Sequence, residues 1–168
     1  MIRRLSLLLA LMFAVSLSVH AQGLGDKLEL YGGYSFTRFG SSPSVNLNGW
    51  DLSGQYKFNG LLGIVADVGG AYGKVAGVSS SVYTYLFGPQ VSFPARVSPF
   101  AHVLVGGSHF SGGGFTSKGF AVGVGVGIDT HIHNRLFWRI IQIDYLPTHL
   151  GGNTQNSARL STGVVLHF

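Results

Sequence analysis

A histidine and a serine two positions apart, His109 and Ser111, are the residues whose types fit catalysis. Such a pair can hydrolyse an ester, with the imidazole as general base and the hydroxyl as nucleophile, when a carboxylate orients the imidazole. The pair lies in a glycine-rich segment that offers nothing to fix either side chain, Glu29 is the single glutamate, and Asp51 is the one aspartate expected nearby. We therefore predict that the chain is not an enzyme and has no catalytic residues, with lipid hydrolysis as a less favoured alternative.

Neither a metal site nor a nucleotide site is predicted. The sequence has no cysteine, which excludes thiolate ligands and disulfides. His131 and His133 stand in an expected turn, and the other histidines show no ligand spacing that repeats on one face. The glycine run at 123–127 lacks the G-x-G-x-x-G spacing of a nucleotide-binding loop. We therefore expect no cofactor and no metal.

Eight segments can position side chains, and most of them alternate apolar and polar residues with the period of two that is typical of a β-strand. The fifth segment is mostly apolar on both faces, and there we expect His102 to face inward. The alternation is sharpest in 119–129, where one face carries Phe, Val and Ile and the other carries glycine, Ala121 and Asp129. The predicted strands are Lys27–Arg38, Leu47–Phe58, Leu61–Gly73, Ser81–Phe93, Pro99–Gly107, Gly119–Asp129, Arg135–Leu146 and Ser157–Phe168.

Two positions predict local backbone features between or within these strands. Asn59-Gly60 predicts a type I′ hairpin turn, because both central residues of that turn need positive φ. Pro89 has no N–H to donate to a neighbouring strand, so we expect a bulge or a register irregularity there.

The seventh strand predicts a β-bulge. A regular strand places odd-numbered and even-numbered residues on opposite faces. Arg139 is odd-numbered whereas Gln142 and Asp144 are even-numbered, so a regular strand cannot place all three on one face. One extra residue near Ile140 and Ile141 would bring the three polar side chains to the same side.

The first 21 residues predict a secretory signal peptide. They have a basic start, an apolar run at 5–17 and a small-residue cleavage site at 19–21. A membrane-anchoring helix is disfavoured, because the apolar run is shorter than the roughly 20 residues that span a bilayer. We predict a signal peptide over 1–21 and one β-barrel domain over 22–168.

The composition favours a sheet with one face against lipid. Only 10% of the residues are charged and the mean hydropathy is +0.34, whereas soluble domains carry about 25% charged residues. A soluble barrel would need a charged exterior, which these strands do not supply. Outward-facing aromatic residues gather at both strand ends, as at two membrane interfaces. They are Tyr34, Phe36, Trp50, Tyr72, Tyr83 and Phe120 at one end, and Phe58, Phe93, Phe168 and either Phe137 or Trp138 at the other.

The connections between the predicted strands alternate in length. Short links follow the second, fourth and sixth strands, and long segments lie at 39–46, 74–80, 108–118 and 147–156. We interpret the long segments as loops. An even number of strands with short turns on one side and long loops on the other is the pattern of bacterial outer-membrane barrels, and it puts both termini in the periplasm.

The last strand resembles the signal by which such barrels are delivered to the barrel assembly machinery, carried here by Ser161, Gly163, Leu166 and Phe168. Over 28–168 the chain resembles the small eight-stranded outer-membrane barrels of the OmpA/OmpX-like class. The resemblance implies an all-β, antiparallel up-and-down transmembrane β-barrel in the bacterial outer membrane, in contact with its lipids, including lipopolysaccharide. Some small barrels of this kind are lipid A deacylases with a His-x-Ser pair, so a lipid A-modifying enzyme is the second alternative function.

Eight charged residues are expected to face the barrel interior, which in an eight-stranded barrel is just wide enough for side chains to fill it. Opposite charges buried there would neutralise one another, and the glycine row at 123–127 would give two arginines room to cross the lumen. We predict a structural or surface-interaction role, with a narrow porin-like channel as the first alternative. The eight residues are Glu29, Asp51, Lys57, Asp67, Asp129, Arg139, Asp144 and Arg159.

Three basic residues, Arg38, Lys74 and Lys118, lie in or beside the first three long loops. They can pair with lipopolysaccharide phosphates or remain solvated. We expect a monomer, and no nucleic-acid partner, because the excess of positive charge is mild and scattered. The sequence does not identify what the external loops bind.

Overall fold

The computed structural model describes residues 27–40, 45–75, 78–150 and 153–168, and the expected signal peptide lies outside these residues. Among the described residues, no helix is long and apolar enough to cross a membrane. The described residues form eight strands: β1 (Leu28–Phe39), β2 (Val45–Lys57), β3 (Leu62–Val75), β4 (Val78–Ser92), β5 (Val97–Gly112), β6 (Phe115–His133), β7 (Leu136–Leu150) and β8 (Asn153–His167).

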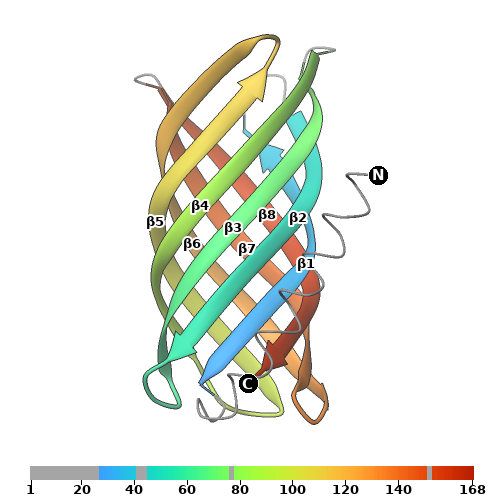
Figure 1. Cartoon of the computed structure of the whole chain (residues 1–168), viewed down its shortest axis with the longest axis vertical. Coiled ribbons are helices and arrows are strands. Elements are labelled where there is room, and N and C mark those ends of the chain that lie inside the picture. The colour runs from blue at the N-terminus through green and yellow to red at the C-terminus, as the bar shows by residue number, and fades with distance from the viewer. Residues whose placement is uncertain (1–26, 41–44, 76–77, 151–152) are drawn as a thin grey trace, which may run out of the picture.

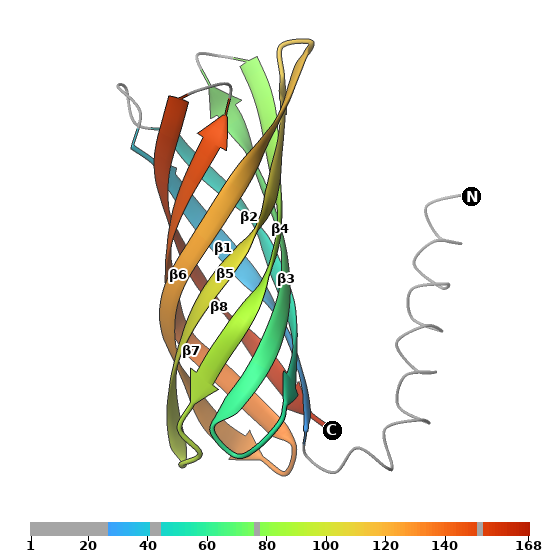
Figure 2. The ribbon, with the colours of Figure 1, turned by 90° about the vertical axis from the view of Figure 1, so that its left-hand side faces the viewer.

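The strands form one closed antiparallel barrel (Figure 1), which confirms the predicted fold. Each strand pairs with its neighbours in the sequence, and β8 returns to pair with β1, from Glu29 opposite His167 to Phe39 opposite Ser157. The view turned by 90° shows the same tilted strands wrapping around the barrel (Figure 2). Closure pairs both edges of every strand. An unpaired edge would offer its backbone groups to another chain, and so favour aggregation.

The two ends of the barrel differ, and we name them by their position in Figure 1. The lower end carries the connections at 58–61, 93–96 and 134–135 and the last residue, Phe168. The upper end carries the connections that follow β1, β3, β5 and β7.

Alternation along each strand separates an apolar exterior from a polar interior. In β6, Val124 and Val126 are 49% and 55% exposed, while Gly125 between them is buried. Buried polar residues such as Gln142 and Ser161 occupy the inward positions of β7 and β8. An exterior of large apolar side chains is the reverse of a soluble protein and suits contact with lipid.

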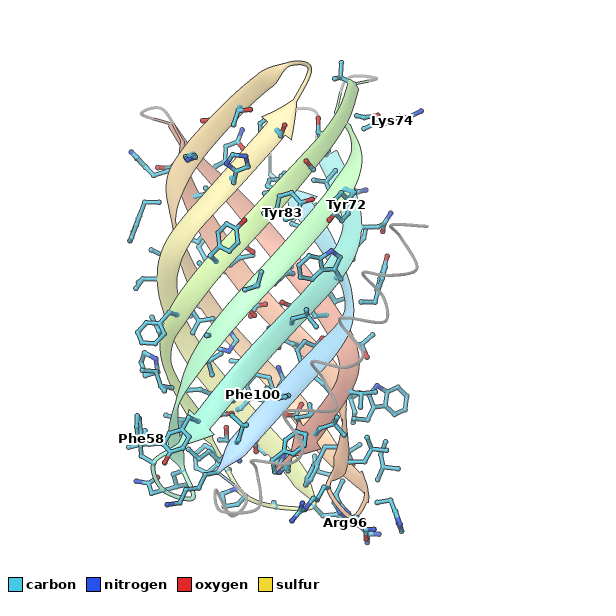
Figure 3. The ribbon with its side chains drawn as sticks, viewed as in Figure 1. Phe58, Tyr72, Lys74, Tyr83, Arg96 and Phe100 are labelled. Atoms are coloured by element: carbon cyan, nitrogen blue, oxygen red, sulfur yellow. The ribbon has the colours of Figure 1, made fainter. Side chains whose placement is uncertain are left out.

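Aromatic residues lie on the outer surface toward both ends, as predicted. Tyr72 and Tyr83 lie in the upper half and Phe58 lies at the lower end (Figure 3). Near the upper end the polar edges of three rings are linked, because Trp50 Nε1 donates to the Tyr72 hydroxyl at 3.2 Å and Tyr72 donates to the Tyr83 hydroxyl at 3.0 Å.

At the lower end the structure decides between the two aromatic candidates of β7. Trp138 is 49% exposed on the outside. Phe137 instead stacks on His167 at the mouth of the barrel, with ring centroids 3.9 Å apart.

Three of the four predicted long loops are wrong, because most of their residues extend the strands. Residues 41–44 of the fourth, at 39–46, lie outside the described ranges, so that loop stays a prediction. The segment 108–118 is a ribbon of β5 and β6, paired from Ser108 opposite Gly119 to Gly112 opposite Phe115. Gly113 and Gly114 alone connect the two strands, with φ of 59° and 80°. Glycine and serine have low strand propensity, but the ladder of the neighbouring strand pairs their backbone groups here. The segments 74–80 and 147–156 are likewise mostly strand.

The predicted type I′ turn at Asn59-Gly60 is also wrong. Within the described ranges, the residues with positive φ are Asn134, Gly113 and Gly114. The connection at 58–61 is instead held by the Asn59 side chain, whose Oδ1 accepts hydrogen bonds from the amides of Leu61 and Leu62 at 2.9 and 2.7 Å. An asparagine side chain can thus replace the backbone geometry of a tight turn.

The two predicted bulges have opposite outcomes. The register between β7 and β8 shifts between Arg139 and Gln142, and both residues are buried, which confirms the bulge at Ile140 and Ile141. Pro89 forms no bulge: it pairs in regular register with Ile64 of β3. On its other side, the register with β5 is the same before and after it, so the missing N–H removes pairing without inserting a residue.

Candidate functional site

Most of the charged side chains of the strands lie in the barrel interior. Six strands supply the eight predicted interior charges, and the structure buries all of them except Lys57, which is half-buried. Alternation places most of them there. On β7 the bulge allows both Arg139 and Asp144 to point inward.

Arg159 of β8 lies at the centre of this interior and binds three carboxylates. Its Nε donates to Asp144 Oδ2 at 2.9 Å and its Nη1 to Asp51 Oδ1 at 3.0 Å. Both Nη atoms donate to Asp67, at 3.1 to 3.3 Å. Ser161 adds a hydrogen bond to Asp51 at 3.1 Å. One guanidinium therefore connects β8 to β2 and β3, with which β8 shares no backbone pairing.

Asp144 connects this centre to two further polar side chains. Its Oδ2 accepts from Gln142 Nε2 at 2.8 Å, and its Oδ1 lies 2.8 Å from His102 Nε2. Because a carboxylate oxygen only accepts, the Nε2 of His102 carries the proton of this bond. Gln142 continues the chain through its Oε1, which accepts from Arg139 Nη1 at 2.6 Å.

Arg139 has a planar environment that suits a guanidinium. Its Nε and Nη2 donate to the two oxygens of Asp129 at 2.8 and 3.0 Å. Tyr31 and Phe100 lie against the group, each with its ring centroid 4.2 Å from the guanidinium carbon. This is a two-point ion pair combined with cation–π stacking, an arrangement that lysine cannot reproduce.

The predicted charge network is divided into two parts. Arg139, Arg159 and their four aspartates form one hydrogen-bonded network, which we call the central network. Glu29 pairs with Lys57, and His167 Nε2 lies 3.0 Å from Glu29 Oε1, near the lower end. Among the described side chains, no hydrogen bond joins this second group to the central network.

The glycine row of β6 was predicted to make room for the two arginines, but it makes room for other side chains. A Cβ on Gly125 would collide with Asp144 and His102, and one on Gly127 would collide with the Phe100 ring that covers Arg139. Arg159 lies instead against Gly69 of β3, where a Cβ would come within 2.8 Å of Nη1. The β6 glycines therefore accommodate the partners of the arginines, not the arginines themselves.

The central network leaves little open space. A cavity of about 20 Å³ lies beside Arg159 toward the upper end, and one of about 10 Å³ lies beside Arg139 toward the lower end. A single water needs about 10–15 Å³ measured in this way. Each cavity therefore holds about one water molecule.

Several residues that contact the central network were missed as functional residues by sequence reasoning. His102 and Gln142 were expected inside but without a role, and Tyr31 and Phe100 were not expected to stack on an arginine. The available signal was the alternation of faces along a strand. It places Tyr31 on the inward face of β1 with Glu29, and Phe100 on the inward face of β5 with His102.

The residues of the predicted assembly signal lie in different environments along β8. Ser161 is buried and binds Asp51, whereas Leu166 is exposed on the outer face. Gly163 lies so close to the backbone of β1 that a Cβ would collide with it. The amide of Phe168 donates to the carbonyl of Leu28 at 2.8 Å.

The catalytic candidates are not assembled into a site. His109 and Ser111 lie in the regular ribbon of β5, opposite Lys118 and Thr116 of β6, and no hydrogen bond joins the two side chains among those described. The five acidic residues in the described ranges all point into the barrel. The described part of the chain also contains no group of three or more His, Asp or Glu side chains that could hold a metal ion.

Comparison with known proteins places this geometry in context. A family profile described as "Outer membrane protein beta-barrel domain" matches residues 7–168. No curated protein sequence matches the chain. Three of the similar solved structures illustrate the likeness, which at their low sequence identities establishes a shared fold.

The first of these structures is Neisserial surface protein A (NspA), with a TM-score of 0.75 and 18% identity over 84% of this chain and 97% of that one. Ail, the attachment invasion locus protein of Yersinia pestis, has a TM-score of 0.57 and 18% identity over 84% and 99% of the two chains. The N-terminal β-barrel domain of Pseudomonas aeruginosa OprF has a TM-score of 0.51 and 14% identity over 85% and 98%.

Proposed function

We propose that this chain, which belongs to the outer membrane protein β-barrel domain family and resides in the bacterial outer membrane, acts there as a closed barrel with a structural or surface-interaction role. In this proposal side chains fill the lumen, so that solutes do not cross it. The protein contacts its surroundings at the two ends of the barrel. The lower end, with Phe168, faces the periplasm.

The observation that carries the proposal is the central network. Arg159 alone binds carboxylates on three other strands, at 2.9 to 3.3 Å. A solute crossing the lumen would have to break several charge-assisted hydrogen bonds at once, and each is worth about 1.5–3 kcal/mol. The cavities beside the network, of about 20 and 10 Å³, have room for about one water molecule each, which is too little for a file of solutes.

Solute flux tests this role. The full mature protein, refolded into liposomes, is expected to give no more swelling with glycine or arabinose than liposomes without protein. Heat-modifiable migration on a gel confirms that the barrel is folded in the same sample. Swelling by the wild-type protein above the protein-free rate would replace the closed barrel with the narrow channel.

The upper end supports a contact with lipopolysaccharide phosphates. Arg38, Lys74 and Lys118 are exposed there, and Lys74 projects from the upper end in Figure 3. Lys74 also lines an open groove of about 640 Å³ between the β3–β4 and β5–β6 hairpins, together with several serines. Ammonium and hydroxyl groups suit phosphate and sugar ligands.

Binding of labelled lipopolysaccharide to the double variant Lys74→Gln/Lys118→Gln tests this contact. We expect affinity to fall about tenfold, since two solvent-exposed ion pairs, each worth up to about 1 kcal/mol, are removed. Unchanged affinity would mean that the basic groups remain solvated.

The remaining features of the proposal are a monomeric state, assembly through β8 and the absence of catalysis. The last rests on the outer surface, where His109 and Ser111 have no orienting carboxylate among the described residues. A lack of fatty-acid release from lipid A by the refolded protein is the expected result. Release that is abolished by Ser111→Ala would make the chain an enzyme.

A further inference from the structure

The lower mouth of the barrel is an open vestibule of about 510 Å³. The connections at 58–61, 93–96 and 134–135 form its rim, and Phe137 supplies an aromatic wall. Its volume lies within the range of about 300–1,000 Å³ that is usual for small-ligand sites. The basic side chains that line it are Lys27, Lys57, Arg135, His131 and His167.

Positive charge in this vestibule is not balanced by the described side chains. Among them, the carboxylate close to the vestibule is that of Glu29, which is already bound by Lys57 and His167. No described side-chain carboxylate lies within ion-pair distance of Lys27 or Arg135, because the other described acidic groups are in the central network. Arg96 adds a further positive charge at the lower end, where Figure 3 shows it projecting from the barrel.

Several hydrogen-bond donors remain available in the vestibule. An ammonium group has three donors, so Lys57 keeps two after its bond to Glu29. The Nε2 of His131 already donates to the carbonyl of Asn134 at 2.9 Å, so the neutral imidazole adds no further donor. The guanidinium of Arg135 can form a two-point contact with an anion.

We propose that the vestibule at the lower end binds a phosphate-bearing ligand. A phosphate group carries one negative charge as a diester and up to two as a monoester, with two or three free acceptor oxygens, so it can bind several of the cations that line the vestibule at once. The stacked rings of Phe137 and His167 offer an adjacent flat surface for the rest of the ligand. This inference goes beyond the proposed function, because it concerns the lower end and neither the central network nor the lipopolysaccharide contact.

The phosphate can belong to a soluble molecule or to the headgroup of a phospholipid. Both sources are tested with the full mature protein in a maltoside detergent, which contains no phosphate. Inorganic phosphate is the soluble probe and phosphatidylglycerol mixed into the micelles is the lipid probe, at constant ionic strength. The readout is the NMR signals of the His131 and His167 imidazoles.

Two matched double variants locate the binding. Lys27→Gln/Arg135→Gln removes two charges from the vestibule and leaves the Glu29 pair intact. Lys74→Gln/Lys118→Gln removes the same charge from the upper end. We expect saturable shifts of both imidazoles in the wild type and in the upper variant, and an apparent affinity about tenfold weaker or more in the lower variant.

The two probes distinguish the sources. Saturation with inorganic phosphate identifies a soluble ligand, and saturation with phosphatidylglycerol alone identifies a lipid headgroup. Each result supports the site if the lower variant weakens it. Equal affinity in the two double variants, or no saturable shift with either probe, overturns the proposal. Heat-modifiable migration of each variant shows that the barrel is folded, so a loss of shifts is not a loss of fold.

Discussion

Replacement of Arg159 by methionine is the perturbation for which the structure predicts the largest loss of stability. The guanidinium is the shared partner of Asp51, Asp67 and Asp144, through five hydrogen bonds of 2.9 to 3.3 Å. Methionine fills similar space but leaves three buried carboxylates without their cation. Removal of one partner of a buried ion pair costs about 3–5 kcal/mol, so we expect Arg159→Met to lower the free energy of unfolding by at least about 3 kcal/mol.

Replacement of one of the three carboxylates should cost less stability than replacement of Arg159. Asp67 accepts hydrogen bonds from Arg159, which keeps two other carboxylates when Asp67 is neutralised. We therefore expect Asp67→Asn to cost less than half as much as Arg159→Met. The loss of unfolding free energy in the double variant should be smaller than the sum of the losses in the two single variants, because residues that share a contact are not independent.

Urea unfolding in phospholipid vesicles measures these effects. The two tryptophans, Trp50 and Trp138, report on folding by fluorescence. Lys74→Met, an exposed substitution at the upper end, is the matched control and should change stability by no more than about 0.5 kcal/mol. A loss below about 1 kcal/mol for Arg159→Met, or one equal to that of the control, would refute the reasoning.

Two further substitutions test the packing around the central network with the same unfolding assay. Gly125→Ala should cost about 1–3 kcal/mol, because the new methyl group collides with Asp144 and His102. Gly54→Ala is the control, because its nearest neighbour is a side-chain atom at an ordinary 3.5 Å; equal losses at both glycines would argue against a tightly filled interior. Arg139→Lys should cost about 1–3 kcal/mol despite the retained charge, because an ammonium cannot keep the two-point ion pair and the stacking; full stability would show that a point charge suffices.

The barrel itself was accessible from the sequence because its signal is repeated on every strand. Alternation with a period of two fixes which side chains share a face, and one buried face fixes the register. The same logic predicted the bulge of β7, since Arg139, Gln142 and Asp144 cannot otherwise share a face. Alternation also predicts the apolar outer surface, because most of the large apolar side chains fall on the outer face of their strands.

The strand ends at the upper end were not accessible in the same way. Serine and glycine indicate a loop by local propensity, yet the segment around Gly112 and Phe115 pairs as a ribbon. Strand formation there depends on the neighbouring strand, which local propensity does not include. The failure at Asn59-Gly60 has a related cause, since the turn is stabilised by a side-chain hydrogen bond instead of positive φ.

The sequence predicts which residues of the candidate site face the lumen, but it does not predict which of them bind one another. Parity places Arg139, Arg159 and the aspartates inside, but it does not say which pairs meet across the lumen. Contacts between β8 and β2 or β3 depend on the barrel's curvature and on small residues such as Gly69, against which Arg159 lies. Sequence separations of about a hundred residues, as between Arg159 and Asp51, carry no local signal.

Single-channel recording of the refolded mature protein in planar bilayers tests the closed lumen most directly. We expect no discrete current steps for the wild-type protein across the usual range of voltages, while heat-modifiable migration shows that the same sample is folded. Reproducible steps in the wild type that grow larger in Arg139→Ala would contradict the closed lumen, because they would show that ions pass the central network and that its charges act as a gate.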